Sequence, residues 1–478
     1  MSAMYGHADD DWLMRAHGDI DQWAAVMDVD ADDRPIDWNW VRTLDLVHGV
    51  GVATVHDCDA GASSDVHDLL RRDLMIRDRL EAILTCCDRV FMTDYDRLIP
   101  SYRLPRALAH ANRRLNDEIN LLRDRGVTEG LWTVAYEHRE RVTVPVLQAA
   151  EGAPAVDDIQ DRTAELVNGR AERRKRAREQ RGAGERLMVA ANLEGAIAAG
   201  GAAADEVTTA ASPIGSDWRD VYLPGRGLDA VMGIDIETTG TDPLRDYIID
   251  VGFEYMNMVA PRPQDAPAGM PYVDSSYQAG DAYGQARLGF GVTRANAWHG
   301  NETIRNLTGI DVKMRSSSQW RLFDEWPQAQ QGLLMRLEQQ PFVAHNANFE
   351  HRFFLHNVAG YAESYRAGHI VIIDTMPMSR RWDEGSAPSE AHPYGDNSLE
   401  SYAKRQSALP EDSSERHLGL EDAHIMLVAM KHHLTALREA HRGPWAPMAC
   451  PVPAANAPKV AAGRVVAALE WWHDPSRT

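Results

Sequence analysis

A short apolar run that carries two acids constrains the fold more than any other stretch of this chain. Residues 231–240 read Val-Met-Gly-Ile-Asp-Ile-Glu-Thr-Thr-Gly, so Asp235 and Glu237 interrupt an apolar segment that closes at Gly240. In a strand, side chains two residues apart point the same way, which puts both acids on one face. Adjacent carboxylates repel each other and are costly to bury. A hard cation such as Mg²⁺ or Mn²⁺ between them removes that cost; the alternative is an exposed strand end with two solvated acids.

Length, charge and cysteine content restrict the class of protein. The 478 residues exceed what a single core supports, and the net charge of −21 argues against coating nucleic acid by charge alone. The negative charge is compatible with an enzyme that binds a few nucleotides through metal ions. No apolar run reaches the roughly 18 residues that span a bilayer, and the acidic N-terminus lacks a secretory signal. The four cysteines form no Cys-x-x-Cys pair. We therefore expect a cytoplasmic protein with no membrane partner.

Periodicity predicts a mainly helical N-terminal domain over residues 1–168. Leucines recur at helical spacing between residues 65 and 125, and a shorter, less regular stretch follows from Leu131 to Leu147. Residues 169–217 combine a basic arm with an Ala/Gly-rich linker, which predicts the main domain boundary. The arm is either a phosphate-binding segment or a solvated helix that balances the acidic surface, and the sequence favours neither.

Residues 218–437 alternate short apolar runs with helical patterns, which indicates α/β architecture, and residues 438–478 form a Pro/Ala-rich tail with a short terminal helix. The expected strands are Ala230–Ile236, Tyr247–Phe253, Ala286–Val292, Pro341–Ala344 and Gly368–Ile373. The expected helices are Gln328–Gln339, Asn348–Asn357, Ser398–Gln406 and Leu420–Leu434.

A second polar segment occurs where an expected strand turns into a helix. Residues 342–355 read Phe-Val-Ala-His-Asn-Ala-Asn-Phe-Glu-His-Arg-Phe-Phe-Leu, and the helix bears Glu350. Either Asn346 or Asn348 could cap that helix, because asparagine side chains accept hydrogen bonds from the first turn.

Two later segments add further polar groups at the ends of expected elements. A buried strand ends at Asp374, and residues 417–427 place His417 in a loop before a helix that Asp422 opens. The apolar residues after Asp422 recur at helical spacing, which puts this acid at the edge of a buried stripe.

These motifs resemble those of the DnaQ-like 3′–5′ exonucleases, the histidine-bearing (DEDDh) branch of a superfamily that includes polymerase proofreading subunits and ribonuclease T. The matches are, in order, Asp-x-Glu-Thr-Thr-Gly from Asp235, His-Asn-Ala-x-Phe-acid from His345 and His-x4-Asp-Ala from His417. The similarity covers residues 228–437. It implies a ribonuclease H-like fold, with a mixed sheet of about five strands flanked by helices.

The resemblance also implies a two-metal mechanism. Two divalent ions, Mg²⁺ or Mn²⁺ and roughly 3.5–4 Å apart, would be held by Asp235, Glu237, Glu350 and Asp422. One ion would activate a water, the other would stabilise the leaving oxygen, and His417 would take the proton of the water. Thr238, Thr239 and Gly240 would lie beside the terminal sugar and bind it through backbone groups.

The substrates implied are 3′ ends of single-stranded DNA or RNA, and the products are nucleoside 5′-monophosphates. Such an activity serves proofreading, DNA repair or RNA trimming. The motifs do not decide between DNA and RNA, because the 2′-hydroxyl is read by local contacts. A polymerase or another protein could bind through the N-terminal domain or the C-terminal tail. His345, His351 and His424 are expected to have structural roles.

One residue departs from the family pattern. The second motif normally ends in Asp, whereas Glu350 is longer by one methylene, roughly 1.3 Å of reach. Glu350 could ligate a metal, act through a water, shift the preference toward Mn²⁺ or slow the reaction. The alternative function is a catalytically weakened exonuclease-fold scaffold that binds nucleic acid or a polymerase partner.

Overall fold

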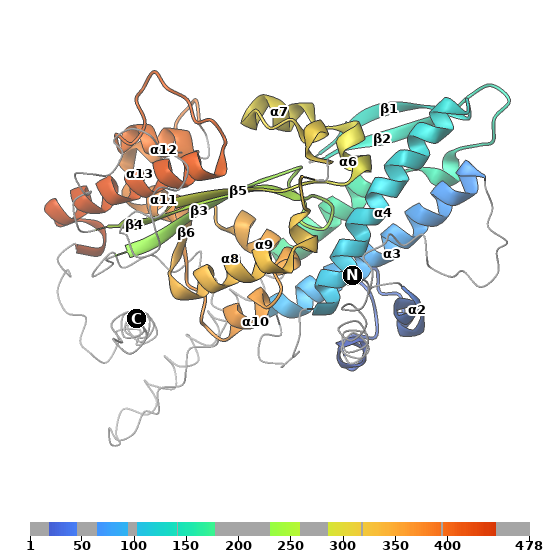
Figure 1. Ribbon diagram of the computed structural model, residues 1–478, viewed down its shortest axis with the longest axis horizontal. Coiled ribbons are helices and arrows are strands. Elements are labelled where there is room, and N and C mark those ends of the chain that lie inside the picture. The colour runs from blue at the N-terminus through green and yellow to red at the C-terminus, as the bar shows by residue number, and fades with distance from the viewer. Residues whose placement is uncertain are drawn as a thin grey trace. The chain divides into compact units, whose positions relative to one another are not determined.

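The computed structural model divides the chain into two compact units, Met1–Ala211 and Ser212–Thr478. Their boundary lies inside the segment predicted as arm and linker. The structure describes residues 19–44, 65–93, 103–140, 142–176, 230–258, 285–316, 319–392 and 395–445 (Figure 1). Most of the predicted linker and the C-terminal tail, with its expected terminal helix, lie outside these described residues. Among the described helices, none combines the length and apolar character that a bilayer crossing needs.

The N-terminal unit is mainly helical, as predicted. Its long helices, α3 and α4, pack against each other. The unit also contains the short helix α2 and helical residues 19–24 and 163–176. The bounds are α2 Trp38–Thr43, α3 Val66–Thr93 and α4 Arg103–Thr128, with a 3-10 turn at Asp157–Ile159.

The stretch Leu131–Leu147, which we predicted as a third helical segment, is instead an antiparallel hairpin. Strand β1, Trp132–Arg139, pairs with β2, Val142–Ala149, from Trp132 opposite Ala149 to Arg139 opposite Val142. The prediction was wrong because valine, threonine and aromatic residues dominate this segment. Their branched or flat side chains favour a pleated surface over a helix.

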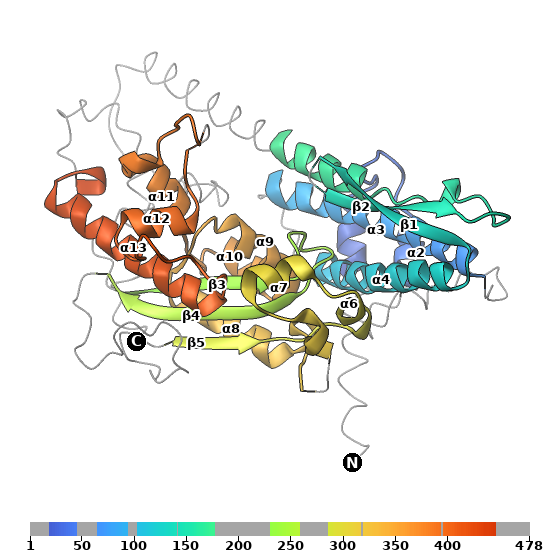
Figure 2. The same cartoon turned by 90° about the horizontal axis from the view of Figure 1, so that it is seen from above.

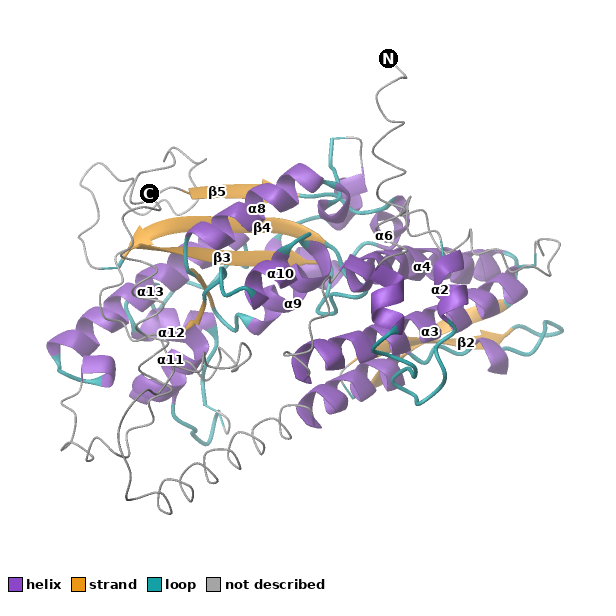
Figure 3. Cartoon of the chain, turned by 90° about the horizontal axis from the view of Figure 1, so that it is seen from below, coloured by secondary structure: helices purple, strands orange, loops and turns teal. Residues whose placement is uncertain are grey.

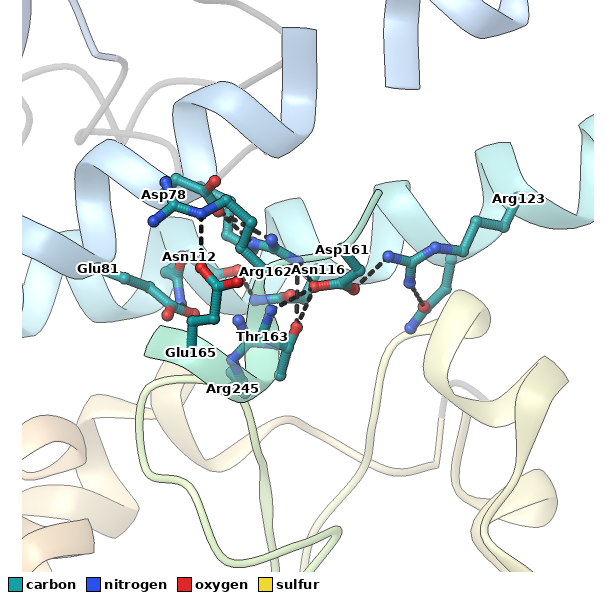
Figure 4. A network of polar contacts seen from close by, with 12 residues as sticks. Asp78, Glu81, Asn112, Asn116, Arg123, Asp161, Arg162, Thr163, Glu165 and Arg245 are labelled. Carbon is teal, nitrogen blue, oxygen red and sulfur yellow. Dashed lines mark hydrogen bonds and ion pairs between the residues drawn. The ribbon is translucent and has the colours of Figure 1, made fainter. Parts of the chain in front are cut away.

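The core of the N-terminal unit contains a network of charged side chains (Figure 4). Arg77 is fully buried on α3 and lies 2.9 Å from Asp161, which also pairs with Arg123. A buried pair of this kind costs several kcal/mol when one partner is removed, because the other charge is left without compensation. The network therefore makes the packing of α3, α4 and the segment around Asp161 specific.

The described part of the basic arm packs against α3. Arg170 is buried with Nη1 3.7 Å from Glu81, and Arg174 pairs with Asp88. Both arginines pair with acids of α3 inside the N-terminal unit. This part of the arm is therefore neither a phosphate-binding segment nor a solvated helix. The remainder of the arm lies outside the described residues.

The second unit contains a mixed sheet of five strands in the order β5-β4-β3-β6-β7. Strand β4 pairs antiparallel with both β3 and β5, whereas β3, β6 and β7 run parallel. All five strands lie at positions that the sequence predicts, with ends shifted by a few residues. They are β3 Ala230–Thr238, β4 Ile248–Asn257, β5 Gln285–Gly289, β6 Phe342–Ala344 and β7 Ile372–Asp374.

Helices cover both faces of this sheet (Figures 1 and 3). One face carries α8 Pro327–Gln339, α9 Asn348–Asn357 and α10 Tyr361–Arg366; the other carries α11 Thr375–Trp382, α12 Leu399–Arg405 and α13 Gly419–Glu439. The predicted mixed sheet with flanking helices is thereby confirmed, as are the four predicted helices. Helices α10 and α11, with α6 Arg294–His299 and α7 Glu302–Thr308, were not predicted because they are too short for a periodic signal. Short 3-10 turns occupy Val312–Ser316, Phe323–Glu325, Glu384–Ser386 and Gly443–Trp445.

Helix α13 lies directly on β3 and β4 (Figure 2). Two strand glycines make this close approach possible. A Cβ atom at Gly252 would lie 1.9 Å from the backbone nitrogen of Leu420, and one at Gly233 would lie 2.6 Å from Cγ of Leu427. The first turn of α13 therefore meets the sheet where the acids of β3 lie.

Candidate metal centre

Strand β3 presents Asp235 and Glu237 on the face that α13 covers. Asp235 lies opposite Gly252 of β4 and Glu237 lies opposite Asp250, with a register shift immediately after Glu237. Because Gly252 has no side chain, the space above Asp235 is open to the first turn of α13. The alternation of β3 therefore places both acids on the same side, as the sequence predicts.

Helix α13 brings a third acid to the same point. Asp422 lies in the first turn of α13, near the positive end of the helix dipole, which favours a negative charge there. One carboxylate oxygen from each of Asp235, Glu237 and Asp422 lies within 4.8 Å of the others. Asp422 lies far along the sequence from Asp235 and Glu237, so only the fold could bring it to them.

A second group shares Asp422. Ligand atoms of Glu415, His417 and Asp422 also lie within 4.8 Å of one another. Nδ1 of His417 is 2.8 Å from Glu415 Oε1 and 3.9 Å from Asp422 Oδ2. Sequence reasoning missed Glu415. The available signal was an acidic side chain two residues before His417, close enough in the sequence to reach the imidazole.

Glu350 lies close to these acids but belongs to neither group. It sits on α9, which begins where the parallel strand β6 ends, and it is only 2% exposed. Its charge contributes to the raised pKa of Asp235, so the two carboxylates are near each other. The structure thus brings Asp235, Glu237 and Asp422 together, with Glu350 at the side.

Burial and mutual repulsion raise the pKa values of these acids. Burial, together with Glu237, Asp422 and Glu350, raises the pKa of Asp235 well above its usual value. Burial raises the pKa of Glu237 to about 8, with a further contribution from Asp250, and burial with Glu415 raises that of Asp422 to about 8. The hydrogen bond to Glu415 raises the pKa of His417 to about 9.

The donor set fits a hard divalent cation. Oε2 of Glu350 and Oδ1 of Asp422 are buried and have no hydrogen-bond partner among the described residues. Unpartnered buried carboxylate oxygens are costly, and a cation would satisfy them. Carboxylate oxygens with a single imidazole suit Mg²⁺ or Mn²⁺ better than softer metals.

The threonine side chains of the turn after β3 form hydrogen bonds within the protein. Thr238 Oγ1 donates to the Gly240 carbonyl, while Thr239 Oγ1 accepts from the Tyr247 amide at 2.9 Å. The Asn301 side chain donates to the Thr239 carbonyl at 2.8 Å. Both threonines are buried, so a ligand beside this turn would meet backbone groups rather than these hydroxyls.

Three histidines of the second unit make short internal contacts. Nδ1 of His345 is 2.8 Å from Thr375 Oγ1, and Nε2 is 2.7 Å from the Asn397 carbonyl. Nδ1 of His351 is 2.8 Å from the Tyr361 hydroxyl, and Nδ1 of His424 is 2.7 Å from Glu254. These contacts support the structural roles expected for all three.

The predicted asparagine cap of α9 is wrong. Ala347 precedes the helix and makes no side-chain cap, while Asn346 adopts a φ of 65°. In this left-handed conformation the backbone N–H of Asn346 donates to Asp374 Oδ1 at 2.9 Å. Asp374 also accepts from the Met376 amide at 3.0 Å, so it caps α11 and ties that helix to the turn before Glu350.

Comparisons with known proteins add no assignment. No protein-family model and no curated protein sequence matches this chain. The case for a function therefore depends on the motifs and on the arrangement of Asp235, Glu237, Asp422 and His417.

Proposed function

We propose that this chain is a metal-dependent 3′–5′ exonuclease of the DnaQ-like type. It would hydrolyse phosphodiester bonds at the 3′ ends of single-stranded DNA or RNA and release nucleoside 5′-monophosphates. The observation that carries the proposal is the convergence of Asp235, Glu237 and Asp422 on one point, beside His417. The mixed sheet with helices on both faces supports the finer proposal of a ribonuclease H-like fold.

Asp235, Glu237 and Asp422 would hold the cations, with Glu350 beside them. When bound, Mg²⁺ or Mn²⁺ would lower the pKa of water and neutralise the charge that develops on the phosphate. His417 would accept a proton from the attacking water through Nε2, because Nδ1 is held by Glu415. The negative charge of Glu415 then stabilises the imidazolium that forms, in the way that a carboxylate supports a catalytic histidine.

The direct test is nuclease activity of the purified protein on 5′-labelled single strands of DNA and RNA, with Mn²⁺ and with EDTA. Asp235→Ala and Asp422→Ala should each abolish stepwise shortening from the 3′ end, a loss of at least roughly a thousandfold. His417→Ala should lower the rate by about 10²–10⁴-fold. Asp412→Ala, at an exposed acid before the His417 loop, is the matched control. Full activity in either of the first two variants would end the proposal.

A weakened scaffold is the second candidate, and the position of Glu350 outside both three-residue groups favours it. Such a protein would bind a strand or a polymerase without efficient hydrolysis. Titration calorimetry with Mn²⁺ separates the two functions. An exonuclease should bind two ions and release protons, whereas a scaffold need not. Gain of activity in Glu350→Asp would assign the weakness to the extra methylene.

A further inference from the structure

A cavity of about 380 Å³ lies beside the metal centre and is lined by arginines from three separate segments. Arg287 comes from β5, Arg315 from the turn after α7, and Arg416 from the loop before α13. The same loop supplies both sites, because Glu415 and His417 belong to the metal centre while Arg416 and Leu418 line the cavity. The cavity therefore begins one residue away from the proposed base.

Arg287 is held in place by an acid of the neighbouring strand. Its Nε donates to both carboxylate oxygens of Asp250, at 3.0 and 2.9 Å. Asp250 is buried and lies directly opposite Glu237. This pair fixes the guanidinium of Arg287 at the border between the acidic centre and the cavity.

Arg315 is a half-buried cation that forms no ion pair among the described residues, although the Asp250 carboxylate is close enough to act on it electrostatically. Its Nη1 donates to the carbonyls of Ile249 and Phe290, each at 3.3 Å, and its guanidinium lies 3.9 Å from the ring centre of Trp320. Burial lowers its pKa, an effect that the charge of Asp250 partly offsets and that of Arg287 increases. Backbone carbonyls and an aromatic ring stabilise the charge of Arg315 less than an anion would. An anion that enters the cavity would therefore be stabilised by this guanidinium.

Arg416 completes the cationic lining at the exposed side. Its side chain is 60% exposed, and Nη1 lies 3.2 Å from Glu421 Oε1. Asp311 is the acid among the lining residues, and its Oδ1 already accepts from the Lys313 amide at 3.0 Å. The lining thus carries three arginines and one acid, and two of the arginines also pair with Asp250 and Glu421 outside the lining.

We propose that this cavity binds a phosphate group. Guanidinium groups bind phosphate oxygens through paired hydrogen bonds, and converging arginines are a common phosphate site. The proposal deepens the proposed function, since its location suits an internucleotide phosphate of the strand whose 3′ end lies at the metal centre. A free monophosphate offers the same chemistry, so the experiment separates the two sources.

The experiment measures binding and needs no turnover. Fluorescence anisotropy with a labelled single strand in EDTA would be recorded over a range of salt concentrations. Arg416→Gln should raise the Kd about five- to tenfold and reduce the slope of log K against log salt by about 0.7, the value for one lost phosphate contact. Arg416→Lys should restore part of the affinity and part of the salt slope. Arg305→Gln, at an α7 arginine that is 58% exposed and outside the cavity lining, is the matched control.

Two further arms identify the source of the phosphate. Strands that carry a neutral methylphosphonate at successive linkages should lose affinity at one position in the natural protein but not in Arg416→Gln. Inorganic phosphate and a nucleoside 5′-monophosphate, titrated by calorimetry, report a free-monophosphate site if Arg416→Gln weakens them instead. Melting temperatures verify that each variant is folded.

The proposal is overturned if the Kd of the strand, its salt slope and the binding of free phosphates are all the same in Arg416→Gln and Arg305→Gln. Because none of these measurements requires hydrolysis, an inactive protein could still possess the phosphate site. An active exonuclease could equally lack it, so the two proposals fail separately.

Discussion

At the scale of single residues, the acids of the metal centre oppose folding when no cation is bound. Asp235, Glu237 and Asp422 lose hydration on burial and repel one another, which raises the pKa of each. Residues arranged in this way favour ligand binding at a cost in stability, as is common at functional sites. Replacing one charge should therefore have opposite effects on stability and on metal binding.

Asp235→Asn tests this opposition, because asparagine keeps the shape and removes the charge. In EDTA at about pH 8 we expect the variant to gain on the order of 1 kcal/mol, or about 2–4 °C in Tm. We also expect it to lose most of the stabilisation by Mn²⁺. Thermal unfolding with and without Mn²⁺ measures both, and Asp412→Asn serves as the exposed control. A lower Tm of the variant in EDTA would contradict the repulsion argument.

Glu415 is expected to act through His417. Its carboxylate, 2.8 Å from Nδ1, orients the ring and raises the pKa of His417 to about 9. Glu415→Gln should therefore lower kcat by about 10–100-fold, as for other partners that orient a functional histidine. The acid limb of the pH–rate profile should move to lower pH, because the base loses its proton more easily. If that limb stays in place, Glu415 does not tune His417.

At the scale of secondary-structure elements, the distance between α13 and the sheet decides whether the centre forms. Gly252→Ala would place a Cβ atom 1.9 Å from the Leu420 nitrogen, a backbone atom that can move only with the helix. We expect a loss of about 1–3 kcal/mol from overpacking and a weaker affinity for Mn²⁺, because Asp422 moves away from Asp235. Chemical denaturation and calorimetry would measure these two effects.

Gly332→Ala on α8 is the control for that variant. A Cβ atom at Gly332 would have only Arg336 Nη1 nearby, at 3.6 Å. Alanine is favoured over glycine inside a helix by about 0.5–1 kcal/mol, so this variant should be more stable and bind Mn²⁺ normally. Equal behaviour of the two alanine variants would show that α13 does not depend on the glycine contact.

At the scale of the whole molecule, pH and metal binding should be linked in the second unit, which carries the metal centre. The pKa of Glu237 rises from 4.5 to about 8 on folding, and that of Asp422 rises from 3.8 to about 8. Between about pH 4 and pH 8 the folded state therefore binds more protons than the unfolded state, and stability falls as pH rises. The raised pKa of His417 acts in the same direction.

We accordingly expect the metal-free second unit to melt at lower temperature at about pH 8 than at about pH 6. Mn²⁺ should raise its Tm more at the higher pH, because bound carboxylates must be deprotonated. Calorimetric scans at both pH values, with Mn²⁺ or EDTA, measure this, and the transition of the N-terminal unit serves as an internal control for the effect of Mn²⁺. A Mn²⁺ effect that is equal at both pH values would count against the carboxylates as ligands.

Sequence by itself determined the elements that a local pattern encodes. Alternation in β3 placed Asp235 and Glu237 on one face, apolar runs located the other strands, and periodicity located α13. Only the tertiary structure decided which side chains meet. The bond between the Asn346 backbone amide and Asp374, the approach of Asp422 to Asp235 and Glu237, and the arginine-lined cavity all depend on packing between distant segments. Periodicity reports which face of an element is buried, but contact across the fold depends on how closely two elements approach, as at Gly252.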